Sequence, residues 1–154
     1  ARENVYRFIL YTFFNYLIGA TDAHAKNHAL LFLAPGDIRL APLYDVASIA
    51  PYRSLAPMKR KPLRAALSIG GENRFGLLGA EHVGKMVRDS NLEEFGLGAG
   101  MLCARLADMA KLVPKALAKV LAEVRSCGTS DKDAVAEAMQ REITANCERL
   151  LARM

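Results

Sequence analysis

The feature that most limits the fold of this chain is an apolar run near its beginning, from Tyr6 to Ala20. Arg7, Thr12 and Asn15 interrupt this run, and a membrane-spanning helix needs about 20 apolar residues, so we expect no membrane segment. The apolar side chains recur at helical spacing and cover most of the helix surface, namely Val5, Phe8, Ile9, Phe13, Phe14, Leu17 and Ile18. Such a helix is predicted to lie in the middle of a core and to end at Gly19.

Length and composition are typical of one ordinary globular domain, or of one lobe of a larger enzyme. The chain has 154 residues and a net charge of +5, and its 52% hydrophobic and 24% charged residues exclude global disorder. Its 3 cysteines favour reduced thiols over a disulfide framework. We find no secretory signal and expect a cytoplasmic protein. Because the sequence begins inside a helical pattern without a methionine, we interpret it as a fragment that lacks its N-terminal part.

The order of the predicted elements indicates a mostly α fold with a small β hairpin. A polar loop, residues 20–28, follows the first helix, and turn residues around Gly36 separate two short apolar segments of a hairpin. Residues 47–67 contain prolines and basic residues without an apolar period, which predicts a long loop without regular structure. A short strand and a turn are predicted at residues 67–71.

The remainder of the chain, residues 79–154, is predicted to be helical. One helix covers Gly79 to Ser90, and a second carries an apolar stripe in which Pro114 marks a kink or the first turn of a new helix. The last helix is predicted to begin after an N-cap at Ser130. Its apolar face is formed by Val135, Met139, Ile143, Cys147, Leu150 and Met154.

Three polar residues on either side of the hairpin have the chemistry that phosphoryl transfer needs. This reaction requires a carboxylate that orients and deprotonates a hydroxyl, and oxygen ligands for magnesium. Asp22 and Asn27 have the spacing of a kinase catalytic loop, and Asp45 follows the hairpin, where a second metal ligand is expected. On spacing alone, loop capping also explains Asp22 and Asn27, and a turn or helix cap explains Asp45.

The segments that contain these residues resemble the C-terminal lobe of HipA-type kinases, the serine/threonine-kinase toxins of bacterial type II toxin–antitoxin systems. The resemblance lies in Ile18-Gly-Ala-Thr-Asp22-Ala-His24-Ala-Lys-Asn27, in Ala41-Pro-Leu-Tyr-Asp45-Val46 and in Ser68-Ile-Gly-Gly-Glu-Asn-Arg-Phe75. The Asp-x-His-x-x-Asn pattern is also similar to the catalytic loop of phosphoinositide lipid kinases. The resemblance runs from about residue 6 to residue 90. It implies that residues 1–154 form one helical lobe of a protein-kinase-like or phosphoinositide-kinase-like fold.

The resemblance implies roles for five residues and two cofactors, Mg²⁺ and ATP. Asp22 would be the catalytic base, Asn27 a magnesium ligand in the nucleotide site, and Asp45, in segment 43–46, the second metal-binding carboxylate. His24 would steady the transferring phosphate or the Asp22 carboxylate, or else orient the loop through hydrogen bonds. Lys26 would contact the nucleotide unless it is an ordinary exposed lysine.

A complete kinase of this type also needs an N-terminal lobe with a phosphate-covering loop and a phosphate-pairing lysine, and we find neither here. We therefore expect the chain to be inactive in isolation. The resemblance implies a serine or threonine of a protein as the acceptor, with a small-molecule or lipid acceptor as a variant. It also implies an antitoxin-like, DNA-binding partner similar to HipB. The alternative is a non-catalytic helical module that docks such a partner or DNA.

The basic stretch from Arg53 to Arg64 is the candidate docking segment of that module, and it has three interpretations. It docks a substrate, it contacts DNA phosphates, or it is a solvated loop. Only Tyr52 is available for stacking and the stretch is not helical, so we do not expect sequence-specific reading of DNA. Any contact with DNA is predicted to be indirect or non-specific and sensitive to salt.

Two other motifs imitate ligand sites, and we expect neither to act as one. The segment from Gly79 to Lys85 is similar to a phosphate-binding loop, but Met86 stands where a serine or threonine would bind magnesium. His24 and His28 have the spacing of zinc ligands on a helix, but they are predicted to lie in a loop and lack the accompanying glutamate.

Overall fold

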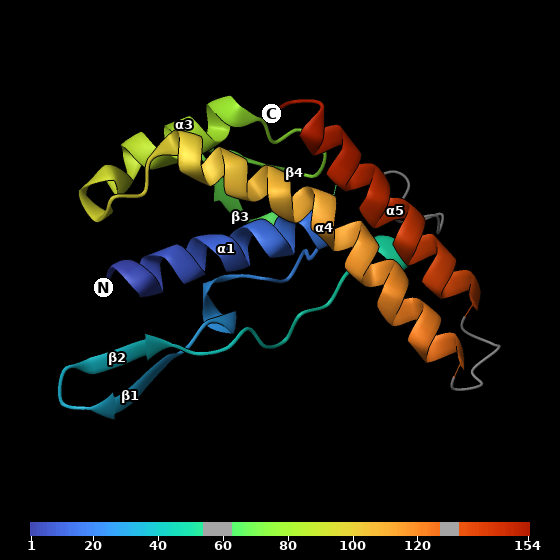
Figure 1. Cartoon of the computed structure of the whole chain (residues 1–154), viewed down its shortest axis with the longest axis horizontal. Helices are drawn as coiled ribbons and strands as arrows, with labels where there is room; N and C mark the ends of the chain where they lie inside the picture. Colours follow the sequence, from blue (N-terminus) through green and yellow to red (C-terminus); the bar gives the residue numbers. More distant parts are fainter. Residues whose placement is uncertain (54–62, 127–132) are drawn as a thin grey trace.

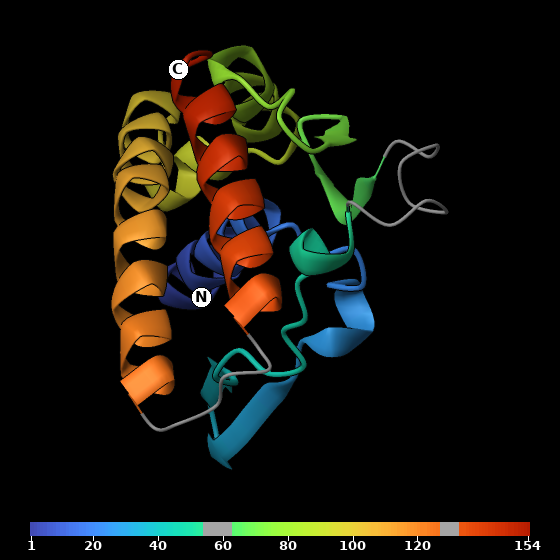
Figure 2. The ribbon, with the colours of Figure 1, turned by 90° about the vertical axis from the view of Figure 1, so that its right-hand side faces the viewer.

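The computed structural model describes residues 1–53, 63–126 and 133–154. It confirms a mostly α fold, with two small antiparallel sheets instead of one hairpin. Three helices form the body of the molecule: α1 (Arg2–Ile18), α4 (Ala99–Ser126) and α5 (Asp133–Leu151). Figures 1 and 2 show that the hairpin of β1 (Leu30–Ala34) and β2 (Asp37–Leu40) projects away from this body.

Helix α1 lies at the centre of the core, as its apolar surface predicts. It packs against both α4 and α5, and Phe13 and Leu17 have no exposed surface. The second half of α1 is the buried part, whereas most residues of the first half are exposed or partly exposed. The other side chains of the core without exposed surface are Ile69, Leu78, Val83, Leu102, Leu106 and Leu150. The end of α1 is therefore enclosed by other elements, and this end leads into the predicted catalytic loop.

The first sheet is the predicted hairpin, in which β1 (Leu30–Ala34) pairs with β2 (Asp37–Leu40). The side-chain amide of Asn4, in α1, hydrogen-bonds to the backbone of β2 through both its nitrogen and its oxygen. Its Nδ2 donates to the carbonyl oxygen of Ile38 at 2.6 Å, and its Oδ1 accepts from the backbone N–H of Leu40 at 2.9 Å. The hairpin is thus attached to α1, although every residue of β1 is exposed.

The prediction of an unstructured basic stretch at residues 47–67 was wrong at both of its ends. A 3-10 turn occupies Ala50–Tyr52, and strand β3 begins at Arg64 and continues to Ile69. Strand β3 pairs with β4 (Glu72–Arg74) and contacts both α1 and α3 (Ala80–Asp89). These contacts bury Ala65 and Ile69, so burial of alternate residues produces a strand despite the basic composition. Residues 54–62, which include Lys59, Arg60 and Lys61, lie outside the described residues.

The C-terminal region is helical as predicted, but Pro114 neither ends a helix nor starts one. Helix α3 (Ala80–Asp89) is followed by the 3-10 turn Leu92–Phe95 and then by α4, which continues through Pro114. The carbonyl oxygen of Pro114 accepts a hydrogen bond from Nε2 of Gln140 in α5 at 3.0 Å. Packing of α4 along α5 therefore overrides the tendency of proline to interrupt a helix. The predicted N-cap at Ser130 lies outside the described residues.

No helix in the described part of the chain is long and apolar enough to cross a membrane. Two of the cysteines, Cys103 and Cys147, are free thiols, in agreement with the prediction for them. Burial raises the pKa of Cys147 to about 12, so this thiol stays protonated and behaves as an apolar core side chain.

The carboxylate of Glu72 stabilises strand β4 by accepting four hydrogen bonds. Glu72 is 6% exposed, and its Oε1 accepts from the backbone N–H groups of Asn73 at 2.9 Å and Arg74 at 2.8 Å. The guanidinium of Arg74 adds two further bonds, of 3.0 and 2.6 Å. The bond from Arg74 is the largest cause that lowers the pKa of Glu72 to about 2. Next to it, the hydroxyl of Tyr16 donates to the carbonyl oxygen of Arg74 at 2.7 Å.

A pair of alanine substitutions should separate backbone strain from steric exclusion in the turn between β3 and β4. Gly70 and Gly71 both have positive φ, of +58° and +89°. A Cβ on Gly70 would lie 1.9 Å from the carbonyl oxygen of His82, whereas one on Gly71 would meet nothing within 4 Å. We expect Gly71→Ala to lower the free energy of unfolding by about 1–2 kcal/mol, and Gly70→Ala by about 3 kcal/mol or more. Urea unfolding measures both, and equal losses would contradict the close approach of the turn to α3.

The acid stability of the fold should depend on Glu72. Because its folded pKa is lowered to about 2 from 4.5, its contribution is complete above pH 4.5 and is lost as the pH falls through about 2. We expect Glu72→Gln to lower the free energy of unfolding at pH 7 by about 1–2 kcal/mol, a value reduced by solvent screening of the exposed Arg74. The variant should also lose part of the acid-dependent slope in denaturant titrations between pH 4.5 and 2.

The matched control for this experiment is Asp37→Asn in the hairpin. Asp37 also faces an arginine two residues further along its strand, and Arg39 donates to both carboxylate oxygens at 3.0 Å. The side chains of Asp37 and Arg39 are 39% and 62% exposed, so we expect little change in stability. An equal loss of stability in the two variants would show that burial of the Glu72 carboxylate does not contribute to the free energy of unfolding.

Candidate active site

The predicted catalytic loop leaves α1 through a helix end of fixed geometry. Gly19 has φ +74°, and its N–H donates to the carbonyl oxygen of Tyr16 at 3.2 Å. The N–H of Ala20 donates to the carbonyl oxygen of Asn15 at 2.9 Å. These two bonds form the Schellman arrangement, which reverses the chain direction and needs a residue that tolerates positive φ. Ala20 and Ala23 are buried and anchor the loop in the core.

Within the loop, the backbone of Asp22 organises the residues that follow it. The carbonyl oxygen of Asp22 accepts from the backbone N–H of His24 at 2.9 Å and from Nδ2 of Asn27 at 2.8 Å. The N–H of Asn27 donates to the carbonyl oxygen of His24 at 3.0 Å, which forms the short 3-10 turn Ala25–Asn27. The amide nitrogen of Asn27 is therefore engaged, and its oxygen is the atom that can face a cation.

The side chains of Asp22 and His24 lie next to each other at the surface of the loop. His24 Nε2 is 3.5 Å from Asp22 Oδ1, and the two side chains are 45% and 80% exposed, respectively. The other ring nitrogen of His24, Nδ1, is buried without a hydrogen-bond partner among the described residues. The arrangement leaves the carboxylate accessible to a substrate and places a potential cation beside it.

Asp45 has a strained backbone. Its φ is +52°, and the only other described residue besides glycine with positive φ is Asn91. Such conformations cost about 1–3 kcal/mol and gather at functional sites, where the surrounding structure maintains them. The side chain of Asp45 is exposed, so burial does not explain its conformation.

Three hydrogen bonds join the segment around Asp45 to the region that carries the loop. The hydroxyl of Tyr44 donates to the backbone carbonyl of Lys26 at 3.3 Å. Further along, the hydroxyl of Ser48 donates to the carbonyl oxygen of Ile18, and the N–H of Ile49 donates to that of Gly19 at 3.2 Å. These bonds lie on both sides of Asp45, which means that its position depends on the loop and on the end of α1.

The structure thus places four of the five predicted site residues in one hydrogen-bonded loop, namely Asp22, His24, Lys26 and Asn27. The neighbouring Tyr44 attaches the segment of the fifth, Asp45, to that loop. Lys26 takes part through its backbone, and its side chain is exposed. The chemical roles of these residues stay predictions.

His28 and Lys85, from the zinc-like and phosphate-loop-like motifs, make other contacts in the structure. In the described ranges, no three or more His, Cys, Asp or Glu side chains come together as a metal site. The ring of His28 packs edge-on against Phe8 with centroids 4.9 Å apart, and its Nδ1 is 3.2 Å from the carbonyl oxygen of His24. Lys85, at the end of the phosphate-loop-like segment, forms an ion pair with Asp89 on the exposed face of α3.

The sequence reasoning missed three polar residues that hydrogen-bond to the loop or to the end of α1: Tyr44, Ser48 and Asn146. The hydroxyl groups of Tyr44 and Ser48 give no pattern that would distinguish them from other polar residues in a loop. Asn146 does leave a signal, because it interrupts the apolar stripe of α5 next to Cys147 and is 5% exposed. A buried amide on an apolar helix face indicates a specific partner.

Substitutions at Asp45 should reveal the backbone strain. We expect Asp45→Gly to raise the free energy of unfolding by up to about 1 kcal/mol, because glycine adopts positive φ without a steric penalty. Asp45→Ala should lower it by about 1 kcal/mol, since alanine lacks the polar side chain that makes aspartate tolerant of this region. Urea unfolding of the two variants and the wild type is the measurement. A glycine variant that is no more stable than the alanine variant would contradict the left-handed conformation.

A family model described as "HipA-like C-terminal domain" matches residues 1–130 of the chain. The chain therefore belongs to the family of HipA-like C-terminal domains. The match contains the predicted catalytic loop, both sheets, α3 and all of α4.

The chain is also similar to proteins that carry kinase names. It is 26% identical over 138 residues to the serine/threonine-protein kinase toxin HipA of Shewanella oneidensis, covering 90% of this chain and 29% of that protein. The Y4mE protein of Sinorhizobium fredii, also named as a kinase, is 28% identical over 108 residues, or 70% of this chain and 23% of that protein. The chain thus spans less than a third of the length of these relatives.

A solved structure has the same fold. It is described as the Shewanella oneidensis MR-1 toxin–antitoxin system HipA, HipB and its operator DNA complex. The TM-score is 0.68 with 24% sequence identity, over 94% of this chain and 31% of that chain. This similarity establishes the mostly helical architecture with its small antiparallel sheets.

Proposed function

We propose that this chain is the catalytic-loop lobe of a HipA-like kinase, which transfers the γ-phosphoryl group of ATP to a serine or threonine of a protein. The observation that carries the proposal is the hydrogen-bonded unit of Asp22, His24 and Asn27, attached through Tyr44 to the strained Asp45. Backbone strain of this kind gathers at functional sites, which supports a chemical role for the exposed carboxylate of Asp45.

In this proposal, Asp22 accepts the proton of the acceptor hydroxyl. Its carboxylate is open to solvent, and His24 contacts one of its oxygens, Oδ1, so the other oxygen is available to the hydroxyl. Positioning and electrostatic stabilisation account for most of the catalysis in phosphoryl transfer, and there is little covalent chemistry for the protein to perform. His24 therefore acts mainly by keeping the carboxylate in a productive orientation.

The donor atoms of Asn27 and Asp45 fit a magnesium site. Both side chains offer oxygen, the ligand type that Mg²⁺ prefers, and Asn27 has its amide nitrogen occupied by the carbonyl of Asp22. Bound Mg²⁺ would neutralise charge on the phosphates of ATP. Lys26 is exposed at the same loop and would contact the nucleotide. The remaining part of the nucleotide site would come from an N-terminal lobe, so we expect no transfer by residues 1–154 alone.

The test is phosphoryl transfer by the full-length protein that contains this chain, measured with radiolabelled ATP. We expect Asp22→Asn to reduce the transfer rate by about 10²–10⁴-fold, the usual contribution of a general base. Asp45→Asn should reduce it at low Mg²⁺ and be partly restored at high Mg²⁺, because it removes one charged ligand but retains an oxygen. Asp108→Asn, an exposed aspartate of α4, is the control and should leave the rate unchanged.

Equal activity of the wild type and Asp22→Asn would exclude the proposed role of Asp22. A thermal-shift titration of the chain with Mn²⁺ gives an independent result, because only a ligand that prefers the folded state raises the melting temperature. Stabilisation of the wild type but not of Asp45→Asn is expected. Stabilisation of both would place the cation elsewhere.

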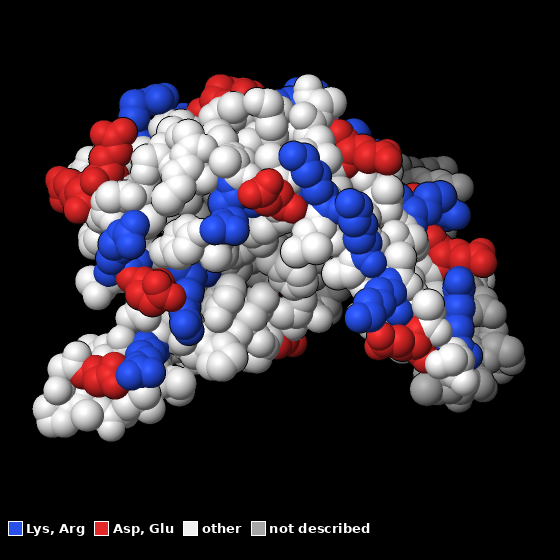
Figure 3. Space-filling view, viewed as in Figure 1, with Lys and Arg blue, Asp and Glu red and all other residues white. Residues whose placement is uncertain are grey.

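A second candidate function is docking of an antitoxin-like, DNA-binding partner, with a non-specific contribution from DNA. The structural neighbour holds HipA with HipB and operator DNA, which supports this candidate. Figure 3 shows a row of basic side chains along the body of the molecule, and Lys111, Lys115 and Lys119 of α4 are exposed. Most of the basic stretch in which the sequence predicted the contact lies outside the described residues. Transfer that depends on Asp22 would exclude a purely non-catalytic module.

A further inference from the structure

Asn146 is one of the few polar side chains buried in the described core. It lies on the apolar face of α5, and it is 5% exposed. Its Nδ2 donates to the carbonyl oxygens of Tyr16 and Leu17, each at 2.9 Å. Its Oδ1 is buried without a hydrogen-bond partner in the described part of the chain. Burying an amide with an unsatisfied oxygen is unfavourable, so an apolar residue would be preferred here unless the two donated bonds had a purpose.

The two bonds from Asn146 are part of a group of hydrogen bonds to the last carbonyl groups of α1 and to that of Gly19. The final carbonyls of any helix lack partners inside the helix. Here Asn146 adds a second donor to the carbonyl of Tyr16, which already accepts the N–H of Gly19, and binds the carbonyl of Leu17. The hydroxyl of Ser48 binds the carbonyl of Ile18, and the N–H of Ile49 binds that of Gly19, the residue after the helix. We call Asn146, Ser48 and Ile49 the helix-end clamp. The clamp joins three parts of the chain that are distant in sequence: the end of α1, the segment after Asp45, and α5.

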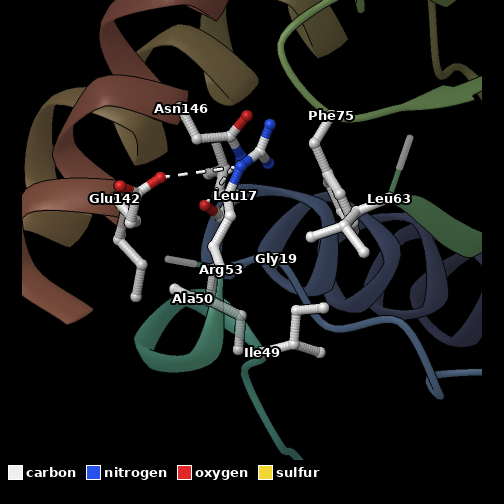
Figure 4. A pocket seen from close by; sticks show the side chains of 11 residues that line it. Leu17, Gly19, Ile49, Ala50, Arg53, Leu63, Phe75, Glu142 and Asn146 are labelled. Atoms are coloured by element: carbon white, nitrogen blue, oxygen red, sulfur yellow. Dashed lines mark hydrogen bonds and ion pairs between the residues drawn. The ribbon is translucent and has the colours of Figure 1, made fainter. Parts of the chain in front are cut away.

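A second contact between the same elements supports the clamp. Arg53, directly after the 3-10 turn that follows Ile49, lies with its Nε 3.7 Å from Oε2 of Glu142 in α5. Figure 4 shows both side chains beside Asn146, around a small pocket that Leu17 and Gly19 also line. Helix α5 therefore contacts both backbone segments that lead to the site.

We propose that Asn146 is a positioning residue for the predicted catalytic site, an inference that rests on the proposed function. It fixes the direction in which the chain leaves α1, and hence the place of Asp22. Ser48 and Ile49 bind the next two carbonyls, those of Ile18 and Gly19, so the end of α1 that Asn146 holds also fixes the segment of Asp45 relative to the loop. A displacement of about 1 Å at a catalytic group reduces a rate by as much as 10²-fold, so a clamp remote from the chemistry affects transfer.

The chain offers a matched control on the same helix. Gln140 also donates an amide N–H to a backbone carbonyl of another helix, that of Pro114 at 3.0 Å, and its oxygen is likewise buried without a described partner. Its bond joins α5 to α4 and not to α1. Gln140→Leu and Asn146→Leu therefore remove the same type of interaction from α5, but only Asn146→Leu affects the helix-end clamp.

The experiment compares Asn146→Leu, Asn146→Asp and Gln140→Leu in the full-length protein. Asn146→Asp keeps the shape of the side chain but removes the donor, so it separates hydrogen bonding from packing. We expect all three to lower the melting temperature. Only the two Asn146 variants should lower kcat per folded molecule, by about ten- to a hundred-fold, with a higher Mg²⁺ concentration for half-maximal rate and a KM for ATP changed less than about two-fold.

Amide hydrogen exchange provides a readout that does not require activity. In the Asn146 variants, exchange should accelerate in residues 16–28 and 44–50, whereas Gln140→Leu should accelerate it in α4 and α5 only. If the wild type transfers no phosphate while exchange follows this pattern, the clamp stands and the proposed kinase function fails. Faster exchange spread over all of α5 in the Asn146 variants would overturn the clamp. A kcat equal to that of Gln140→Leu would overturn the positioning role.

Discussion

The arrangement of this chain depends on the hydrogen bonds that terminate a buried helix. Helix α1 ends inside the protein, where Leu17 and Ile18 are buried and the last carbonyl groups need donors from outside the helix. The donors come from α5 and from the segment after Asp45. The backbone entering the candidate active site is therefore built into the core, and the loop itself remains exposed to a substrate.

Tyr16 extends this dependence to the second sheet. Its carbonyl group is bound by Asn146, and its hydroxyl donates to Arg74 and accepts from the N–H groups of Leu77 and Leu78. Burial raises the pKa of the Tyr16 phenol, so the hydroxyl stays neutral and keeps its proton for the bond to Arg74. Tyr16 thus contacts the start of the predicted catalytic loop through its backbone and β4 through its side chain.

The exposed residues of the candidate site are held in place differently from the residues of the core. Asp22, His24 and Asp45 are accessible, and their arrangement is maintained by backbone hydrogen bonds instead of burial. The positive φ of Asp45 persists because Tyr44 and Ser48 fix the chain on both sides. This division is typical of catalytic sites, where a rigid scaffold supports polar groups on loops.

The sequence by itself determined the local features of this protein. Helical periodicity predicted α1 and its end at Gly19, turn residues predicted the first hairpin, and the motif around Asp22 and Asp45 indicated the family. Only the tertiary structure decided that α4 continues through Pro114, that β3 begins at Arg64, and that Asn146 holds the end of α1. Periodicity and turn chemistry act over a few residues, and one sequence can show them. The partners of a buried amide or a helix end come from distant segments, and only packing brings those segments together.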